Sequence, residues 1–405
     1  MAGRRRAAAG APARVLALVL TVLLGLCGGL GCTPPAATDD ATEDGIAAAL
    51  DRRAAAVLDR GTGPPADPAD PAAREFANLA DVPLDSWSYR VERVTRHGDR
   101  ATVRAELGYR IAGHDSGQVT SGRRLELTER DGRWHVTADR PEEGAAQQLW
   151  EQGPVRVVRG ENSLVLGVGQ DRVRLAAIAA MADRAVPAVS AAWPERWAGR
   201  VLLLVPASLD AMGALLGAPA AGYRGIAAVT TGASGGGAGA PADRIVVNPE
   251  AYGTLGEPGQ RVVLTHETAH VATRAHTTPA TPLWLSEGFA DWAAYRASGE
   301  EAAQAAPELR EAVRSGAAPP GLPEDRDFAF NGDADALARA YEGGWLACEL
   351  IAERWGEERL RAFYRAVGAH GARPGAVEKA LHDVLSTTPD DFTARWREHL
   401  RARLG

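Results

Sequence analysis

The first third of the chain changes its hydrophobic period from that of a helix to that of a strand. Apolar side chains recur on one side of the segment from Asp44 to Asp59, which predicts an amphipathic helix. After a proline-rich break at 64–71, apolar and polar residues alternate, which predicts half-buried antiparallel strands. The alternating apolar positions are Val103, Ala105, Leu107, Tyr109, Ile111, Leu125, Leu127, Trp134 and Val136. We therefore expect a small α+β domain over residues 44–142, with hairpin turns at 97–99 and 131–132.

The rest of the chain has the pattern of a sheet followed by helices. Short apolar runs predict buried strands, and they cover residues 155–158, 164–168, 201–205 and 245–247. The segment 171–193 is helical in pattern, although Pro187 should kink or split that helix. A glycine-rich stretch over 231–242 lacks the lysine and following helix of a phosphate-binding loop, which favours a surface loop. Helical patterns fill the remainder as far as 390–404. We expect a second domain over residues 147–405, and an α+β fold class for the whole chain.

Composition and charge narrow the function classes. Apolar residues make up 45% of the 405 residues, as in ordinary globular proteins, so disorder throughout is excluded. The net charge is −7, and the basic residues are arginines apart from Lys379. Because no basic excess remains to neutralise phosphates, the balance argues against a nucleic-acid partner.

The N-terminus has the pattern of an export signal. Arg4, Arg5 and Arg6 precede an apolar run from Val15 to Leu26 that is too short for a transmembrane span. The polar stretch that starts after Cys32 makes the region resemble a bacterial lipoprotein signal. We expect residues 1–32 to be the signal, Cys32 to carry lipid, and residues 33–43 to be a linker. The protein would then be anchored at the extracytoplasmic face of the cell membrane; plain cleavage with secretion and an uncleaved anchor are the alternatives.

Only one cysteine lies outside this signal region. Cys27 and Cys32 belong to the signal, which leaves Cys348 without a partner for an intrachain disulfide. Cys348 lies in an apolar helical pattern. This pattern favours a small buried side chain over a catalytic thiol.

The segment from Val262 to Ala272 carries the residues that point to chemistry. It contains a His-Glu-x-x-His motif, His266 to His270, inside an apolar helical pattern. Residues four apart on an α-helix differ by about 40° in direction and roughly 6 Å in height, so His266 and His270 project side by side. This spacing allows both imidazoles to bind one Zn²⁺. Glu267 lies beside the metal without binding it, where it can take a proton from water that the metal activates.

A catalytic zinc site needs a third protein ligand, and two candidates lie downstream. His276 lies six residues after His270, the position of the third ligand in metzincins. Metzincins also have a glycine three residues after the second histidine, where this chain has Thr273, and a methionine turn below the site. The methionines of this chain all lie upstream: Met1, Met181 and Met212. Glu287 is the second candidate, and it is the one we favour.

The two motifs together resemble a known family. His266-Glu267-Thr268-Ala269-His270, followed by Trp284-Leu285-Ser286-Glu287-Gly288-Phe289-Ala290-Asp291, is similar to the gluzincin metallopeptidases, and specifically to bacterial peptidase MA-like domains. The motifs cover 265–292, and general pattern extends the resemblance to 155–405. In that family the glutamate of the second motif is the third zinc ligand, so the resemblance implies this role for Glu287. It also implies that Asp291 orients a ligand histidine and that Tyr341 stabilises the oxyanion.

The remaining expectations concern the starts of two helices and the fold of the first domain. Ser286 should help to start the second motif's helix, and Tyr341 should open a later one. The first domain resembles NTF2-like or cystatin-like folds in its helix-then-sheet order. Its histidines are scattered and suggest no site.

These patterns predict a zinc-dependent peptidase with one Zn²⁺ per chain that acts on peptide or protein substrates. The alternative is a cell-surface binding protein in which the metal site is structural or vestigial. A substitution that removes the Glu267 carboxylate discriminates between the two.

Overall fold

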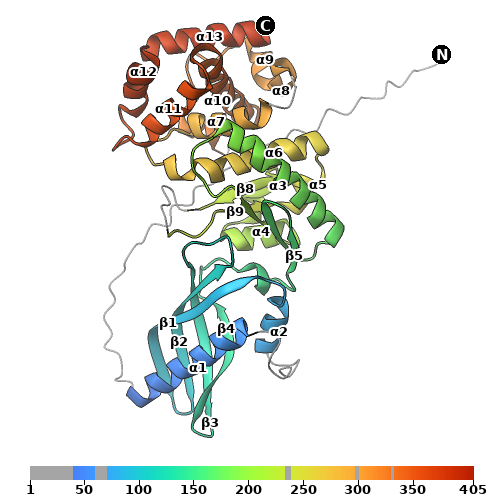
Figure 1. Cartoon of the computed structure of the whole chain (residues 1–405), viewed down its shortest axis with the longest axis vertical. Coiled ribbons are helices and arrows are strands. Elements are labelled where there is room, and N and C mark those ends of the chain that lie inside the picture. The colour runs from blue at the N-terminus through green and yellow to red at the C-terminus, as the bar shows by residue number, and fades with distance from the viewer. Residues whose placement is uncertain (1–39, 60–70, 233–238, 297–300, 330–332) are drawn as a thin grey trace, which may run out of the picture.

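The computed structural model describes residues 40–59, 71–232, 239–296, 301–329 and 333–405. These residues form a mixed α+β structure with two separate sheets and a C-terminal group of helices (Figure 1). The expected α+β class is therefore confirmed. The signal region and Cys32 lie outside the described residues.

The first sheet is an antiparallel meander with the order β1-β2-β3-β4. Its strands are β1 (Leu84–His97), β2 (Arg100–Ile111), β3 (Val119–Arg130) and β4 (Arg133–Pro141). The hairpins turn where the sequence predicts, with positive φ at Gly98 (65°), Asp131 (51°) and Gly132 (70°). Positive φ matches the twist that tight hairpin turns need. The alternating residues Val103 and Leu125 are fully buried in a core that the first helix covers.

That first helix is longer than the sequence indicates. Helix α1 runs from Asp40 to Leu58, so the linker predicted over 33–43 is wrong for residues 40–43. Acidic Asp40 and Glu43 occupy the first turn, where the helix dipole favours negative charge. Arg96 of β1 also donates a hydrogen bond to the buried hydroxyl of Thr42. A short helix that the sequence analysis missed, α2 (Pro71–Asn78), follows.

The second sheet is mixed, with the order β5-β6-β7-β9-β8. Its strands are β5 (Arg156–Arg159), β6 (Ser163–Gly167), β7 (Val201–Val205), β8 (Ala228–Thr231) and β9 (Arg244–Val247). Strands β6, β7 and β9 are parallel, and the two outer strands β5 and β8 run antiparallel to their neighbours. Strand β8 was not predicted, because its four residues, which precede a glycine-rich stretch, are too few to show the alternation of apolar and polar positions that marks a strand.

Helix α3 (Arg172–Ala192) connects β6 to β7 and is not split at Pro187. Proline removes one backbone hydrogen bond, but Val186 and Val189 on either side are buried in the core, and this packing outweighs the loss. The helix is long and apolar enough to cross a membrane, yet half of it is buried inside the molecule. It therefore has the character of a core helix.

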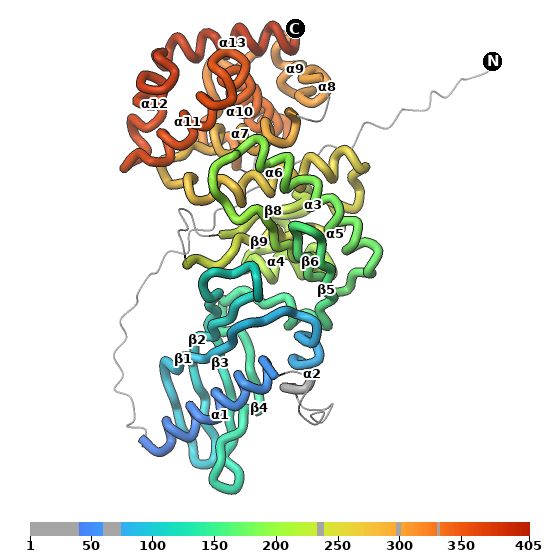
Figure 2. Tube along the Cα trace, viewed as in Figure 1, coloured from blue at the N-terminus to red at the C-terminus, as the bar shows by residue number. Residues whose placement is uncertain are grey.

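Helices fill the C-terminal half. After α4 (Leu209–Leu216) and α5 (Pro249–Gly253) come α6 (Glu257–Thr273), α7 (Leu283–Tyr295), α8 (Ala302–Ala305), α9 (Pro307–Arg314), α10 (Ala334–Trp355), α11 (Glu357–Gly368), α12 (Ala376–Leu385) and α13 (Pro389–Leu404). Helix α6 lies between the second sheet and the other C-terminal helices (Figure 2). Helices α7 and α10 approach closely at Gly288 and Gly344, where an added Cβ would lie 2.2 Å and 2.7 Å from backbone oxygens of the facing helix.

Two details of these helices correct the sequence analysis. Tyr341 does not open its helix, because α10 begins at Ala334, capped by the side chain of Asp333. Ser286 does not start α7, which begins at Leu283. The helix start is held from outside, since Oδ1 of Asp325 accepts a 2.9 Å hydrogen bond from the Leu283 amide. Cys348 is fully buried in α10, as predicted.

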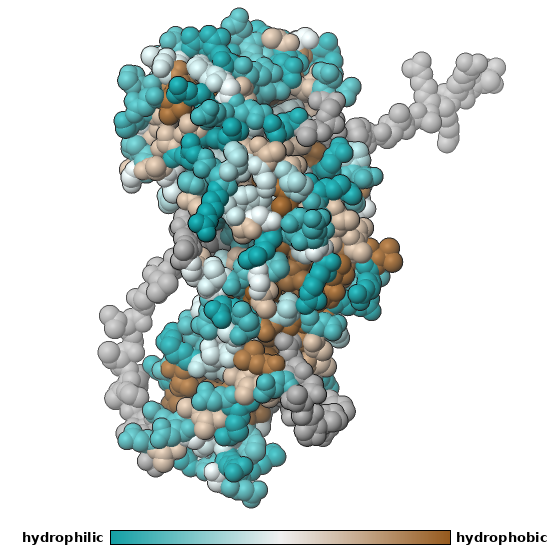
Figure 3. Space-filling model, viewed as in Figure 1, coloured by the Kyte–Doolittle hydropathy of each residue, from teal (hydrophilic) through white to brown (hydrophobic). Residues whose placement is uncertain are grey.

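The two sheets share one apolar core. Trp87 and Tyr109 of the first sheet pack against Trp150, with ring centroids 5.4 Å and 4.9 Å away. The same cluster extends to Leu164 and Leu202 of the second sheet. The two expected domains therefore share buried contacts just after the boundary expected near residue 147. On the outside, the face shown in Figure 3 is largely hydrophilic.

Candidate metal centre

Helices α6 and α7 bring His266, His270 and Glu287 to one point. The Nε2 atoms of the two histidines lie 2.9 Å apart. Oε2 of Glu287 lies 3.4 Å from Nε2 of His266 and 3.6 Å from Nε2 of His270. Among the described residues these three form a group that could hold a metal ion, each offering one ligand atom. Neighbouring turns of α6 supply the two histidines, and the packing of α7 on α6 supplies the carboxylate.

The spacing of these atoms fits a metal ion better than a hydrogen-bonded cluster. Ligands placed tetrahedrally about 2.0–2.1 Å from zinc lie roughly 3.3 Å from one another, close to the three distances here. Both carboxylate oxygens of Glu287 are buried without a hydrogen-bond partner among the described residues. A buried carboxylate without a partner is costly, and a cation between it and the imidazoles removes that cost. The donor set of two nitrogens and one oxygen suits zinc.

Asp291 lies one turn beyond Glu287 and holds one of the ligand histidines. Its Oδ1 lies 2.7 Å from Nδ1 of His266. With Nδ1–H donating to the carboxylate, the lone pair of Nε2 faces the ligand point, as metal coordination requires. Burial opposes the effect, but Asp291 raises the pKa of His266. The pairing therefore also makes this imidazole a stronger base toward a metal.

The other two ligand residues favour their metal-binding forms. Burial lowers the pKa of His270 to about 4, so its imidazole is neutral near pH 7. Burial works to raise the pKa of Glu287, but His270 and His266 offset this and hold it at about 2. A neutral imidazole and an ionised carboxylate are the forms that bind zinc.

Glu267 lies beside the cluster and is held by a residue that the sequence analysis missed. Oγ1 of Thr230, in β8, donates a 2.6 Å hydrogen bond to Oε2 of Glu267. The other carboxylate oxygen, Oε1, is buried without a partner among the described residues. Burial raises the pKa of Glu267 to about 7, the range suited to a general base at neutral pH. The sequence carried no signal for Thr230, because β8 is too short to show an alternating pattern.

Tyr341 and His276 lie in different environments. The charges of Glu287, Asp291 and Glu267 all act on the Tyr341 phenol, and together with burial they raise its pKa well above the usual range. Its ring meets Phe328 edge to face at 5.1 Å. His276 instead lies in a 3-10 turn after α6, with its ring 5.5 Å from that of Trp193. Tyr341 therefore lies within the electrostatic range of the cluster, whereas His276 packs against the core.

The site is shielded from water. Exposed fractions are 0% for His266 and Glu267, 1% for Glu287 and 4% for His270. Electrostatic interactions are strong in such a dry environment.

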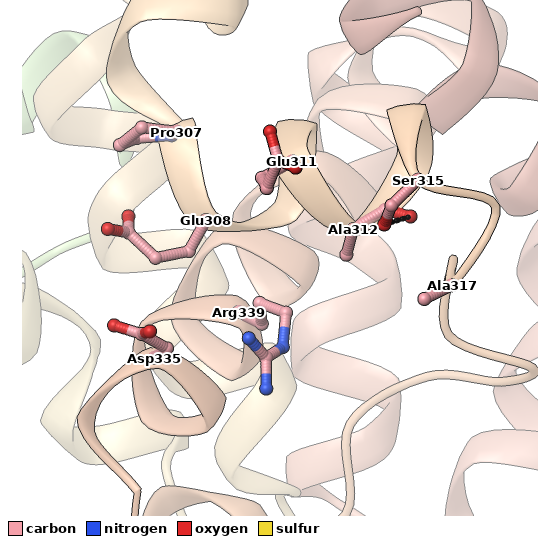
Figure 4. A pocket seen from close by; sticks show the side chains of 8 residues that line it. All are labelled: Pro307, Glu308, Glu311, Ala312, Ser315, Ala317, Asp335 and Arg339. Atoms are coloured by element: carbon pink, nitrogen blue, oxygen red, sulfur yellow. Dashed lines mark hydrogen bonds between the residues drawn. The ribbon is translucent and has the colours of Figure 1, made fainter.

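A separate pocket of about 430 Å³ lies where α9 meets α10 (Figure 4). Glu308 and Asp335 face the same side of it in Figure 4, and Arg339 turns away from them. The carboxylate of Glu342, the residue after Tyr341, accepts hydrogen bonds from the Glu308 and Leu309 amides. Glu342 therefore holds the start of α9, Glu308 and Asp335 line a solvated pocket, and the three residues that could hold a metal lie elsewhere.

No protein-family model matches the chain, and no curated protein matches it.

Proposed function

We propose that this chain is a zinc-dependent peptidase in which His266, His270 and Glu287 hold one Zn²⁺. The observation that carries the proposal is the meeting of three ligand atoms at tetrahedral spacing with a second carboxylate, that of Glu267, beside them. A purely structural zinc site has no use for that additional carboxylate. The pair of motifs that resembles gluzincins points to peptide bonds as the substrate.

The chemistry divides between the metal and the side chains around it. Bound zinc supplies Lewis-acid polarisation of the carbonyl and lowers the pKa of water. Glu267 takes the proton of the attacking water on its free oxygen and passes it to the leaving amine. Thr230 holds the other oxygen so that the carboxylate keeps one orientation. Tyr341, kept neutral by its surroundings, donates a hydrogen bond to the oxyanion that forms.

The proposal also includes a specific fold type for each of the two domains. An antiparallel sheet covered by one helix supports an NTF2-like or cystatin-like first domain. A mixed sheet with the two motifs on adjacent helices supports a gluzincin-type second domain. We further propose that a lipid on Cys32 anchors the protein at the extracytoplasmic face of the membrane.

The burial of the cluster favours a second candidate, a surface binding protein with a structural metal site. Structural zinc sites are closed to solvent, and every ligand here is at most 4% exposed. The two candidates differ in their dependence on Glu267. A structural site tolerates its loss, whereas a hydrolytic site does not.

Glu267→Gln in the zinc-loaded protein tests the proposal. Glutamine keeps the shape and can still accept from Thr230, but it does not take a proton. We expect zinc to stay near one per chain while cleavage of a quenched fluorescent peptide library falls by at least about 10³-fold. Equal cleavage by both forms, or no cleavage by the zinc-loaded parent, would favour the binding protein.

A further inference from the structure

Arg274 is a buried cation beside the metal cluster that the proposed mechanism does not use. It lies four residues after His270 and eight after His266, and the chain at Arg274 keeps right-handed helical backbone angles. Residues at these intervals share one face of a helix, with a rise of roughly 6 Å per step of four. The side chain of Arg274 therefore leaves the same face as the two ligand histidines, one turn further on.

The guanidinium of Arg274 is only partly engaged. It is 92% buried, and its Nε donates a 2.8 Å hydrogen bond to Oδ2 of Asp243. Its Nη2 is buried and has no acceptor among the described residues. Buried guanidinium nitrogens are costly to leave without a partner, and the planar group can hold two carboxylates at its two edges. Nη2 therefore keeps hydrogen-bonding capacity for a second anion.

The second sheet fixes this position from the other side. Gly232 directly follows β8, and an added Cβ there would collide with Oδ1 of Asp243 and lie 3.3 Å from Nε of Arg274. Gly232 is two residues beyond Thr230, which bonds Glu267, and two residues of extended strand span roughly 6.6 Å. Along α6 the rise to Arg274 is roughly 6 Å from His270 and roughly 10 Å from Glu267, so the cation lies about one helical turn beyond the second histidine of the cluster. The charge of Arg274 also acts on Glu267 and His270.

We propose that Arg274 binds a carboxylate of the substrate and makes the site selective for peptides with an acidic group within one or two residues of the bond that is cut. This inference rests on the proposed peptidase function. The carboxylate has two sources, an Asp or Glu side chain and the free C-terminus of the peptide. Asp243 orients the guanidinium and leaves Nη2 for the substrate.

Matched substrates test the proposal and separate the two sources. Peptides cleaved by the zinc-loaded parent are remade with Gln for Glu at each position near the cut, and separately with a C-terminal amide for the free acid. We expect one of the two neutral substitutions to lower kcat/KM by about tenfold or more, mainly through KM. In Arg274→Gln the acidic and neutral peptides should be cleaved equally, and Arg274→Lys should keep part of the preference.

Arg361→Gln is the matched control, since it removes another largely buried arginine, on α11, that is paired with Glu357. It should leave the preference of the parent unchanged. A parent without a preference, or an Arg274→Gln protein that loses the same factor on every substrate, overturns the proposal. If Arg274→Gln does not fold, Arg274→Lys and the paired substrates decide.

A binding measurement keeps this inference separate from the peptidase proposal. Succinate, a simple dicarboxylate, is titrated calorimetrically into zinc-loaded protein carrying Glu267→Gln, with and without Arg274→Gln. We expect succinate to bind about tenfold more weakly, or more weakly still, when Arg274 is replaced. If no peptide is cleaved but this difference is present, the peptidase function fails and the anion site stands; equal binding overturns the anion site.

Discussion

The hydroxyl of Thr230 lies 2.6 Å from Oε2 of Glu267 and joins the outer strand of the second sheet to the helix that carries two of the metal ligands. The second oxygen of the same carboxylate has no partner among the described residues. A general base with one oxygen held and the other free has a fixed direction for the proton it accepts. Strand β8 therefore belongs to the candidate site as well as to the fold.

Thr230→Val should lower kcat about tenfold without changing zinc content, because valine keeps the shape and removes the hydrogen bond to the carboxylate. Thr230→Ser should recover most of the activity. The control is Thr231→Val, since among the described residues the hydroxyl of Thr231 bonds the Arg244 carbonyl, at 3.4 Å, and not Glu267. Steady-state kinetics on one fluorescent peptide measures all three. Equal losses in Thr230→Val and Thr231→Val would contradict a specific role for Thr230.

Zinc binding should depend on Glu287 and not on His276. Glu287→Ala removes a carboxylate whose oxygen lies 3.4 Å and 3.6 Å from the two histidine nitrogens. His276→Ala removes a ring that packs on Trp193. Metal analysis of dialysed protein should give near one zinc per chain for the parent and His276→Ala, and far less for Glu287→Ala. Loss of zinc in His276→Ala alone would point to a metzincin-like ligand set.

Asp291→Asn should weaken zinc binding about 10–100-fold and leave the fold intact. The neutral amide oxygen accepts the hydrogen bond from Nδ1–H of His266 more weakly than the carboxylate does. Nε2 of His266 therefore becomes a poorer metal ligand. Competition with a chromophoric chelator measures the affinity. Asp383→Asn, at an exposed acid that pairs with Lys379, is the control and should match the parent. An unchanged affinity in Asp291→Asn would mean that Asp291 does not support the ligand.

The protein should lose stability between about pH 5 and pH 9 through Glu342. Burial and a hydrogen bond with Glu308 raise the pKa of Glu342 to about 9 in the folded protein. The folded state then binds more protons than the unfolded state above pH 4.5, so the free energy of unfolding falls as pH rises. From pH 5.5 to 8.5 the loss is up to about 4 kcal/mol. Denaturant unfolding at both pH values measures it.

Replacing the titrating group is the matched test of this pH dependence. Glu342→Gln should flatten the fall in stability, because glutamine does not titrate and still accepts from the Leu309 amide. Glu349→Gln, at a carboxylate on the same helix that pairs with Arg403, should keep the fall. The same slope in Glu342→Gln and the parent would assign the pH dependence to another group.

Gly288→Ala should destabilise the fold by about 1–3 kcal/mol and weaken zinc binding. Alanine favours helices over glycine, but its Cβ would lie 2.2 Å from the backbone oxygen of Gly344. Helix α7 must then move away from α10 and shift Glu287. Thermal melts and zinc affinity test this, with Gly222→Ala, where a Cβ meets nothing within 4 Å, as the control. A more stable Gly288→Ala protein would show that the helices separate without cost.

The sequence by itself determined what depends on local geometry. The four-residue spacing of His266 and His270 puts both rings on one helix face in any folded context. The alternation of apolar and polar residues and the glycine-containing turns predicted the first sheet, since each of these signals spans only a few residues. The role of Glu287 needed a family resemblance, because a spacing of 17 residues sets no direction.

Tertiary structure decided everything that depends on one element packing on another. Thr230 reaches Glu267 only because β8 pairs with β9 beside α6, and four residues carry no periodic signal for that strand. Only the packing of Asp243 and Gly232 against Arg274 made it a buried cation whose Nη2 has no acceptor among the described residues. Such contacts join residues tens of positions apart, and the free energy that selects them comes from the burial of whole faces.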